Sequence, residues 1–126
     1  MSEAAGTPPT IELRWPRTDV AQIVLLGEHD LTSGEELEAT LKSVLDVSTK
    51  LVVDLTGVEF IDTTLINGLC RAKRQADLRA IEFGVVIGGN EIVARALEVT
   101  SLVDSLHGVE TLEEALRPRR SGLRAK

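Results

Sequence analysis

Aromatic residues and cysteine are scarce in this sequence. The chain has one tryptophan, two phenylalanines and no tyrosine, so its core must be built from aliphatic side chains. The hydrophobic fraction of 43% is large enough to supply such a core. The single cysteine, Cys70, excludes an intramolecular disulfide and fits a reducing compartment.

Long apolar runs and an excess of positive charge are missing as well. No run approaches the ~20 apolar residues that a membrane-spanning helix needs. The first ten residues, MSEAAGTPPT, lack the basic stretch and apolar core of a secretory signal. The formal net charge of -6 argues against a general nucleic-acid binder. We therefore expect a cytoplasmic protein with no membrane partner and no direct nucleic-acid partner.

The length of 126 residues favours one domain. We expect a flexible N-terminus at 1–10, the domain at 11–117 and a basic flexible tail at 118–126. The segment 117–126 holds four arginines and a lysine but no acid. It is interpreted as a solvated chain end, with a weak contact to an acidic partner as the alternative.

Apolar periodicity predicts the element order β-β-α-β-α-β-α-β-α. Alternation over 11–15 is typical of a half-buried strand, which Pro16 would end. The continuous apolar run within 21–27 predicts a strand buried on both faces. Further strands are expected at 51–55, 81–87 and about 106–109, with a short turn after 55. This pattern predicts an α/β fold in which a mixed sheet of four to five strands packs with about four helices.

Helical spacing predicts helices at 33–46 and 63–78, a third after Asn90 and a fourth after Thr111. Ser33 and Thr111 each precede a glutamate by three residues, which is the pattern of a capping box. In the first helix, Leu37, Leu41, Val44 and Leu45 form one apolar stripe. In the third, the inward residues are expected to be Ile92, Val93, Ala96 and Leu97.

The candidate functional site lies where the second and third strands end. A helix between these strands makes a βαβ unit, so the strands are expected to be parallel and their carboxyl ends to share one edge. Asp30 follows one strand and Asp62 the other. Asp62 directly precedes Thr63 and Thr64 at a helix start, where Asp62 or Thr63 is the expected N-cap.

Other polar residues carry weaker signals. Two carboxylates at one edge suit acid–base chemistry, but no nucleophile or cofactor loop accompanies Asp30 and Asp62, so no enzyme and no cofactor is expected. His29, His107 and Cys70 lack the spacing of metal ligands, so no metal is expected.

Two further segments leave alternatives open. The Gly88-Gly89 turn before Asn90 is either a capped turn or a phosphate cradle, although it lacks the lysine and spacing of a P-loop. Arg71, Lys73 and Arg74 form either a solvated helix face or a binding patch.

Three stretches of the chain resemble the STAS domain, the family of anti-sigma-factor antagonists and of the cytoplasmic domains of sulfate transporters. They are GEHDL at 27–31, LVVDLTGVEFIDTT at 51–64 and TLEEAL at 111–116. The resemblance covers about 11–116 and implies the STAS-type mixed sheet.

The resemblance also implies a switch that regulates transcription in stress responses. In bacterial antagonists of this family, an anti-sigma factor with kinase activity phosphorylates the first hydroxyl residue after the aspartate, which here is Thr63. The unmodified antagonist captures the anti-sigma factor and frees the sigma factor, phosphorylation dissolves the complex, and a phosphatase resets it. The implied partner-binding residues are Asp30, Asp62, Thr64, Leu65 and Asn67.

Two features depart from the family pattern. Both hydroxyl residues are threonines, and Leu65 stands where a glycine is usual. The leucine would either obstruct a kinase beside Thr63 or provide an apolar anchor for a different partner. The alternatives to a switch are therefore an unphosphorylated scaffold or interaction module, and a small-ligand or nucleotide-binding domain that uses the Gly88-Gly89 turn.

Overall fold

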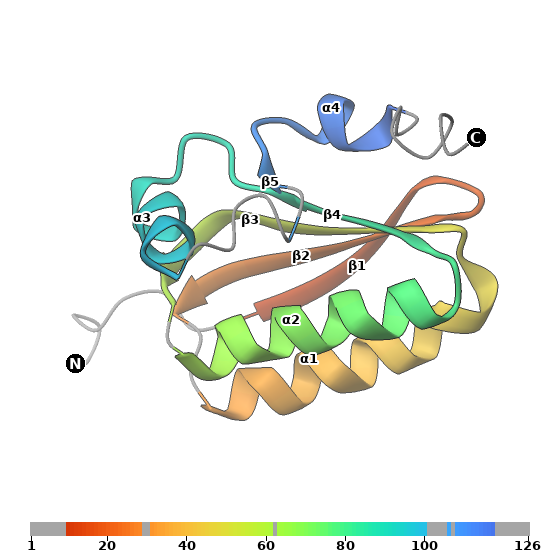
Figure 1. The fold of residues 1–126 in the computed structure, drawn as a ribbon, viewed down its shortest axis with the longest axis horizontal. Helices are drawn as coiled ribbons and strands as arrows, with labels where there is room; N and C mark the ends of the chain where they lie inside the picture. The colour runs from red at the N-terminus through yellow and green to blue at the C-terminus, as the bar shows by residue number, and fades with distance from the viewer. Residues whose placement is uncertain (1–9, 29–30, 62, 101–105, 107, 118–126) are drawn as a thin grey trace.

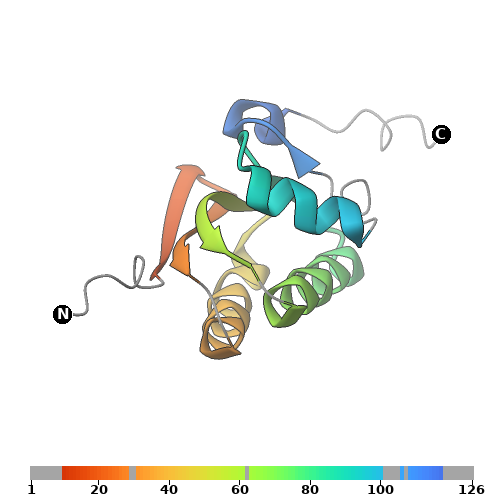
Figure 2. The same cartoon turned by 90° about the vertical axis from the view of Figure 1, so that its left-hand side faces the viewer.

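The computed structural model describes residues 10–28, 31–61, 63–100, 106 and 108–117. Within these residues the chain forms a five-stranded sheet, with α1 and α2 on one face and α4 over the other (Figures 1 and 2). The elements follow the predicted order. They are β1 Thr10–Arg17, β2 Val20–Glu28, α1 Leu31–Val44, the 3-10 turn η2 Leu45–Val47, β3 Lys50–Phe60, α2 Thr63–Leu78, β4 Glu82–Val86, α3 Glu91–Val99, β5 Gly108–Val109 and α4 Leu112–Leu116.

The strands lie in the order β1-β2-β3-β4-β5, so each strand neighbours the next one in the chain. Only β1 and β2 are antiparallel, and every other neighbouring pair is parallel. The prediction of a mixed sheet with a parallel βαβ unit is confirmed. In β2, Ile23, Val24 and Leu25 are buried, which confirms a strand covered on both faces.

The edge strand β1 is more exposed than its alternating pattern predicts. Only Ile11 is partly buried, whereas Leu13 and Trp15 are 40% and 43% exposed. Pro16 does not end the strand, which continues to Arg17 with an irregular register after Arg14. An edge position explains both departures, because the outer side of β1 has no neighbouring strand that needs a regular amide ladder.

Two groups of buried side chains hold the layers together. The larger group fills the space between the sheet and α1 and α2, with α3 closing one end, and it includes all four residues of the predicted stripe on the first helix. The smaller group lies under α4 and consists of Val20, Val52, Val86 and Ala115. None of the helices in the described part of the chain is long and apolar enough to cross a membrane.

Three predicted details of the helices are tested by the structure. α1 begins at Leu31, so the predicted cap at Ser33 is wrong and Ser33 lies inside the first turn. The capping box of Thr111 and Glu114 is confirmed. Ile92 is 51% exposed, so its predicted inward position on α3 is wrong, while Val93 and Leu97 are buried as expected.

Candidate functional site

The carboxyl ends of β2 and β3 lie side by side at one edge of the sheet. The last residues of the two strands, Glu28 and Phe60, are paired with each other. The N-terminal ends of α1 and α2 lie at the same edge (Figure 2). The structure therefore confirms the shared edge that the βαβ unit predicts. Asp30 and Asp62, which follow the two strands, lie outside the described residues.

β3 reaches this edge because it continues to Phe60. The predicted turn after Leu55 is wrong, since the strand absorbs extra residues as irregularities in its pairing with β2. The Asp54 carboxylate accepts hydrogen bonds from the Thr56 amide at 2.9 Å and the Thr56 hydroxyl at 2.8 Å. A Cβ on Gly57 would lie 2.4 Å from Cδ2 of Leu26, so a larger residue here would force the Leu26 side chain to shift.

Asn90, which lies between β4 and α3, holds this irregular part of β3 in place. Its Nδ2 donates to the carbonyl oxygens of Leu55 at 3.1 Å, Thr56 at 3.2 Å and Val58 at 2.8 Å. Its Oδ1 accepts from the amides of Ile92 at 3.1 Å and Val93 at 3.3 Å, which makes Asn90 the N-cap of α3. One side chain thus ties the helix to the strand that leads into the candidate site.

The Gly88-Gly89 turn serves this packing. Gly88 has a φ of 58°, and a Cβ on it would lie 2.3 Å from Cγ2 of Thr56. The first-turn amides of α3 already donate to Asn90 rather than facing a bound phosphate. The turn matches the capped-turn alternative. Among the described residues, no group of three His, Cys, Asp or Glu side chains could hold a metal ion.

The predicted site residues in the first turns of α2 differ in how exposed their side chains are. Thr63 begins the helix with an exposed side chain, Thr64 is partly buried and Asn67 is exposed. Leu65 is fully buried within the main core. Helical spacing causes this division, because Leu65 lies on the same face as Leu69 and Ala72, which pack toward the sheet.

The burial of Leu65 bears on both expectations for this residue. A fully buried side chain neither obstructs a kinase beside Thr63 nor anchors a partner in this conformation. Its bulk is accommodated inside the protein, and direct contact with a partner would need Leu65 to leave the core. The neighbouring threonine remains accessible.

Phe60 is a feature of this edge that the sequence reasoning missed. It is 50% exposed at the end of β3, although it is one of only two phenylalanines. Burial along β3 ends with Val58, and both Glu59 and Phe60 are exposed. No periodic signal distinguishes Phe60 from a core residue, because the exposure depends on where the neighbouring elements stop.

The chain is similar in sequence and in fold to proteins of one known family. The model of the STAS domain family matches residues 17–115. The anti-sigma-F factor antagonist RsfB of Mycobacterium tuberculosis is 31% identical over 104 residues, which cover 82% of this chain and 84% of RsfB. The crystal structure of an anti-sigma factor antagonist from Mycobacterium paratuberculosis has a TM-score of 0.77 at 26% identity, covering 86% of this chain and 92% of that one.

A more distant likeness extends the comparison of the fold. The Bacillus cell fate determinant SpoIIAA, in its phosphorylated form, has a TM-score of 0.66 at 17% identity, covering 85% of this chain and 96% of SpoIIAA. The family match spans most of the described sheet and helices, and the identity to RsfB extends over 82% of the chain. This chain belongs to the STAS domain family, among the anti-sigma-factor antagonists.

Proposed function

We propose that this protein binds an anti-sigma factor with kinase activity and is released when that partner phosphorylates Thr63. The observation that carries the proposal is the exposed Thr63 side chain, which begins α2 at the edge where β2 and β3 end. The identity to RsfB, an anti-sigma-F factor antagonist, supports an anti-sigma factor as the partner. The protein acts as a substrate and regulator rather than as an enzyme.

Phosphorylation at Thr63 would favour the free protein over the complex. A phosphate adds about -1.5 to -2 charges and three strong acceptors. At the N-terminus of α2 this charge meets the positive end of the helix dipole, so the fold tolerates it. Against a docked partner, the same group is bulky and strongly hydrated, so it disfavours the complex.

The proposed partner surface surrounds Thr63. It comprises Asp30, Asp62, Thr64 and Asn67, with Phe60 in place of Leu65 as the apolar contact. The half-exposed ring of Phe60 suits this role, because aromatic side chains that become buried on binding often dominate interface energy. We place the cycle in the cytoplasm, where a phosphatase would restore the unmodified protein.

Phosphate mapping tests the switch directly. The protein is incubated with kinase-type anti-sigma factors and ATP–Mg, and any phosphate is located by mass spectrometry. We expect modification at Thr63 in the wild-type protein and in Thr64→Ala, and none in Thr63→Ala. Phosphate on a different residue, or none with a partner that binds the protein, would contradict the proposal.

Affinity measurements separate a switch from a permanent interaction module. Thr63→Glu introduces a charge at the proposed contact, and we expect anti-sigma factor binding to weaken by more than about a hundredfold, equivalent to about 3 kcal/mol. Thr18→Glu is the matched control, since Thr18 is an exposed residue of the turn between β1 and β2, at the other end of these strands. Binding that is indifferent to Thr63→Glu would support the unphosphorylated module instead.

A further inference from the structure

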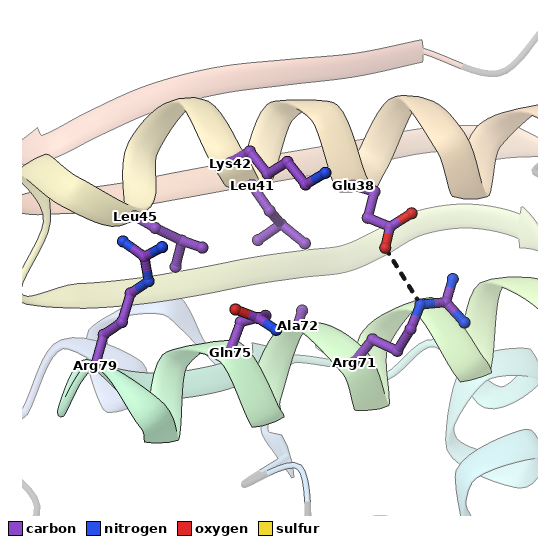
Figure 3. A pocket seen from close by; sticks show the side chains of 8 residues that line it. All are labelled: Glu38, Leu41, Lys42, Leu45, Arg71, Ala72, Gln75 and Arg79. Carbon is purple, nitrogen blue, oxygen red and sulfur yellow. Dashed lines mark ion pairs between the residues drawn. The ribbon is translucent and has the colours of Figure 1, made fainter.

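A groove separates α1 and α2 on the face of the molecule that these two helices form (Figure 3). It has a volume of about 240 Å³. Its walls come from both helices and the residues directly after them. The lining residues are Glu38, Leu41, Lys42, Leu45, Arg71, Ala72, Gln75 and Arg79.

The groove has an apolar floor and a mainly basic rim. Leu41, Leu45 and Ala72 supply the floor and are 4%, 6% and 2% exposed. Three lining residues are cations, whereas Glu38 is the only acid among the lining residues that the structure describes. This basic rim stands out on a chain whose formal net charge is -6.

The cations of the rim remain accessible to an incoming acid. Arg71 uses Nε to pair with Oε2 of Glu38 at 3.4 Å, and both side chains are about half exposed, at 48% and 47% (Figure 3). Arg79 pairs with the more exposed Asp46. In the described part of the chain, the Lys42 amine has no ion-pair partner. Exposed pairs of this kind are worth only about 0–1 kcal/mol, so a carboxylate on a partner can compete for the guanidinium groups.

The size of the groove favours a side chain over a cofactor. Small-molecule sites usually enclose about 300–1,000 Å³. The groove is smaller than this range. A cavity of about 150 Å³ holds a ligand the size of benzene. The groove therefore has room for one or two apolar side chains of a bound peptide.

We propose that the groove between α1 and α2 binds an acidic amphipathic helix of a protein partner. An apolar side chain of that helix lies on the floor of Leu41, Leu45 and Ala72, and its carboxylates pair with the cations of the rim. Laying an amphipathic helix into a groove between two helices is a recurring mode of peptide recognition. Binding at this groove does not require phosphorylation at Thr63.

The spacing of the rim predicts the spacing of acids in the partner. Arg71 and Arg79 are eight residues apart along α2 and the turn after it, which corresponds to about 12 Å at 1.5 Å per residue. Two acids seven or eight residues apart on the partner helix span the same length. The anchoring apolar residue then lies three or four residues after the first acid, on the same face.

The sequence predicts a candidate binding patch of Arg71, Lys73 and Arg74 on α2. Of these three residues, only Arg71 belongs to the proposed site. Lys73 pairs with Asp77 one turn along the same helix, at 2.7 Å. Neither Lys73 nor Arg74 lines the groove, and Arg71 does. In the groove, Arg71 acts together with Lys42 and Arg79. These two cations are not close to Arg71 in the sequence.

A defined peptide tests the proposal. The probe is a synthetic helical peptide with glutamates seven residues apart and leucine between them. Its binding is followed by amide chemical shifts of the full-length protein and by fluorescence anisotropy. We expect shifts centred on Leu41, Leu45, Ala72 and Gln75, and an affinity that falls with added salt because the contacts at the rim are ionic.

Charge reversal provides the matched comparison. Lys42→Glu and Arg79→Glu are each expected to weaken binding about tenfold or more, since like charges then face the peptide. Arg95→Glu makes the same change at an exposed position of α3 outside the groove and should leave the affinity unchanged. A peptide with lysines in place of the glutamates, or serine in place of leucine, should lose binding.

Four outcomes would overturn the proposal. One is the absence of shifts in the groove at about 1 mM peptide, the concentration that corresponds to about -4 kcal/mol of binding. Another is equal binding of the lysine-substituted peptide. The third is the same set of shifts at equal affinity with hexanoate alone, which would identify a site for free carboxylates. The last is the same set of shifts on concentrating the protein without peptide, which would identify a second copy of this chain as the occupant.

Discussion

Leu65 contributes to stability from the core while its neighbour Thr63 faces solvent. Because Leu65 is fully buried, Leu65→Ala should lower the free energy of unfolding by about 3 kcal/mol, through lost apolar burial and the cavity left behind. Urea denaturation measures this cost. Leu78→Ala is the control, since Leu78 is 74% exposed and its removal should change stability by less than about 0.5 kcal/mol. A small cost at Leu65, combined with lost partner binding, would show that this leucine is a contact residue after all.

Asn90 is the residue on which the shape of the candidate edge depends most. Asn90→Ala removes the N-cap of α3 and the donors to three carbonyl oxygens of β3. A lost cap costs about 1 kcal/mol, and the two N–H donors of Nδ2, shared among the three oxygens, contribute about 1 kcal/mol each, so we expect a total loss of about 3 kcal/mol.

Thermal or urea unfolding of Asn90→Ala measures this loss, with Asn67→Ala as the control at an exposed asparagine of α2. If Asn90→Ala were as stable as Asn67→Ala, the hydrogen bonds to β3 would contribute nothing. The sequence predicts the cap, because asparagine precedes a helical pattern. It does not predict the bonds to β3, because they join segments more than thirty residues apart.

At the scale of elements, α4 is a short helix held at both ends. Helices of five residues are unstable alone. The capping box of Thr111 fixes the start of α4, and two cations approach its last carbonyl groups. Nζ of Lys50 donates to the Arg117 oxygen at 3.0 Å, and Nη1 of Arg17 donates to the Leu116 oxygen at 3.4 Å. Lys50 is 7% exposed, so the residues packed around it hold its amine in position.

Lys50→Met should therefore loosen α4 before the rest of the molecule. The change keeps an apolar stem of similar length but removes the donor to Arg117 and the ion pair with Glu82. Hydrogen exchange should show protection falling about tenfold in α4 and β5, equivalent to about 1.4 kcal/mol, with little change in α1 and α2. Lys73→Met, which removes a different ion pair, that with Asp77 on α2, is the control. A uniform fall in every element would mean that Lys50 supports global stability instead.

The number, type and order of the elements could be predicted from the sequence because most of them depend on local patterns. The apolar run of β2 and the stripe of α1 each report burial within one segment, whereas the alternation of β1 predicts a strand but overstates its burial. The continuation of β3 could not be predicted, because Thr56-Gly57 is typical of a turn. It remains a strand through the pairing of Gly57 with Leu26 and the bonds from Asn90, which only the folded chain brings together.

The same distinction applies to the two surfaces. The edge beside Thr63 follows from the parallel βαβ unit and could be derived before the structure was known. The groove could not, because its rim combines Lys42 of α1 with Arg71 and Arg79 at positions set by how two helices pack. The exposure of Phe60 could not be derived from the sequence either. It depends on where the neighbouring elements end and not on the sequence pattern around Phe60.

On the scale of the whole molecule, α2 carries both proposed binding surfaces but keeps them apart. Thr63 begins the helix at the sheet edge, and the groove extends from Arg71 to the turn at Arg79. Arg71 lies about 12 Å along the helix axis from Thr63, and Arg79 about twice as far. Electrostatic screening at physiological salt acts over about 8 Å. A charge at Thr63 should therefore have little direct influence on the groove.

This separation predicts independent binding at the two surfaces. Thr63→Glu should change the affinity of the acidic peptide by less than about twofold, and Lys42→Glu should leave the rate of Thr63 phosphorylation unchanged. In a double-mutant cycle, the two substitutions should then add within about 0.5 kcal/mol. Anisotropy titrations of the wild type, both single variants and the double variant measure the coupling. A coupling of 1 kcal/mol or more would mean that α2 moves as one element between two arrangements, because direct repulsion over this distance is too weak to produce it.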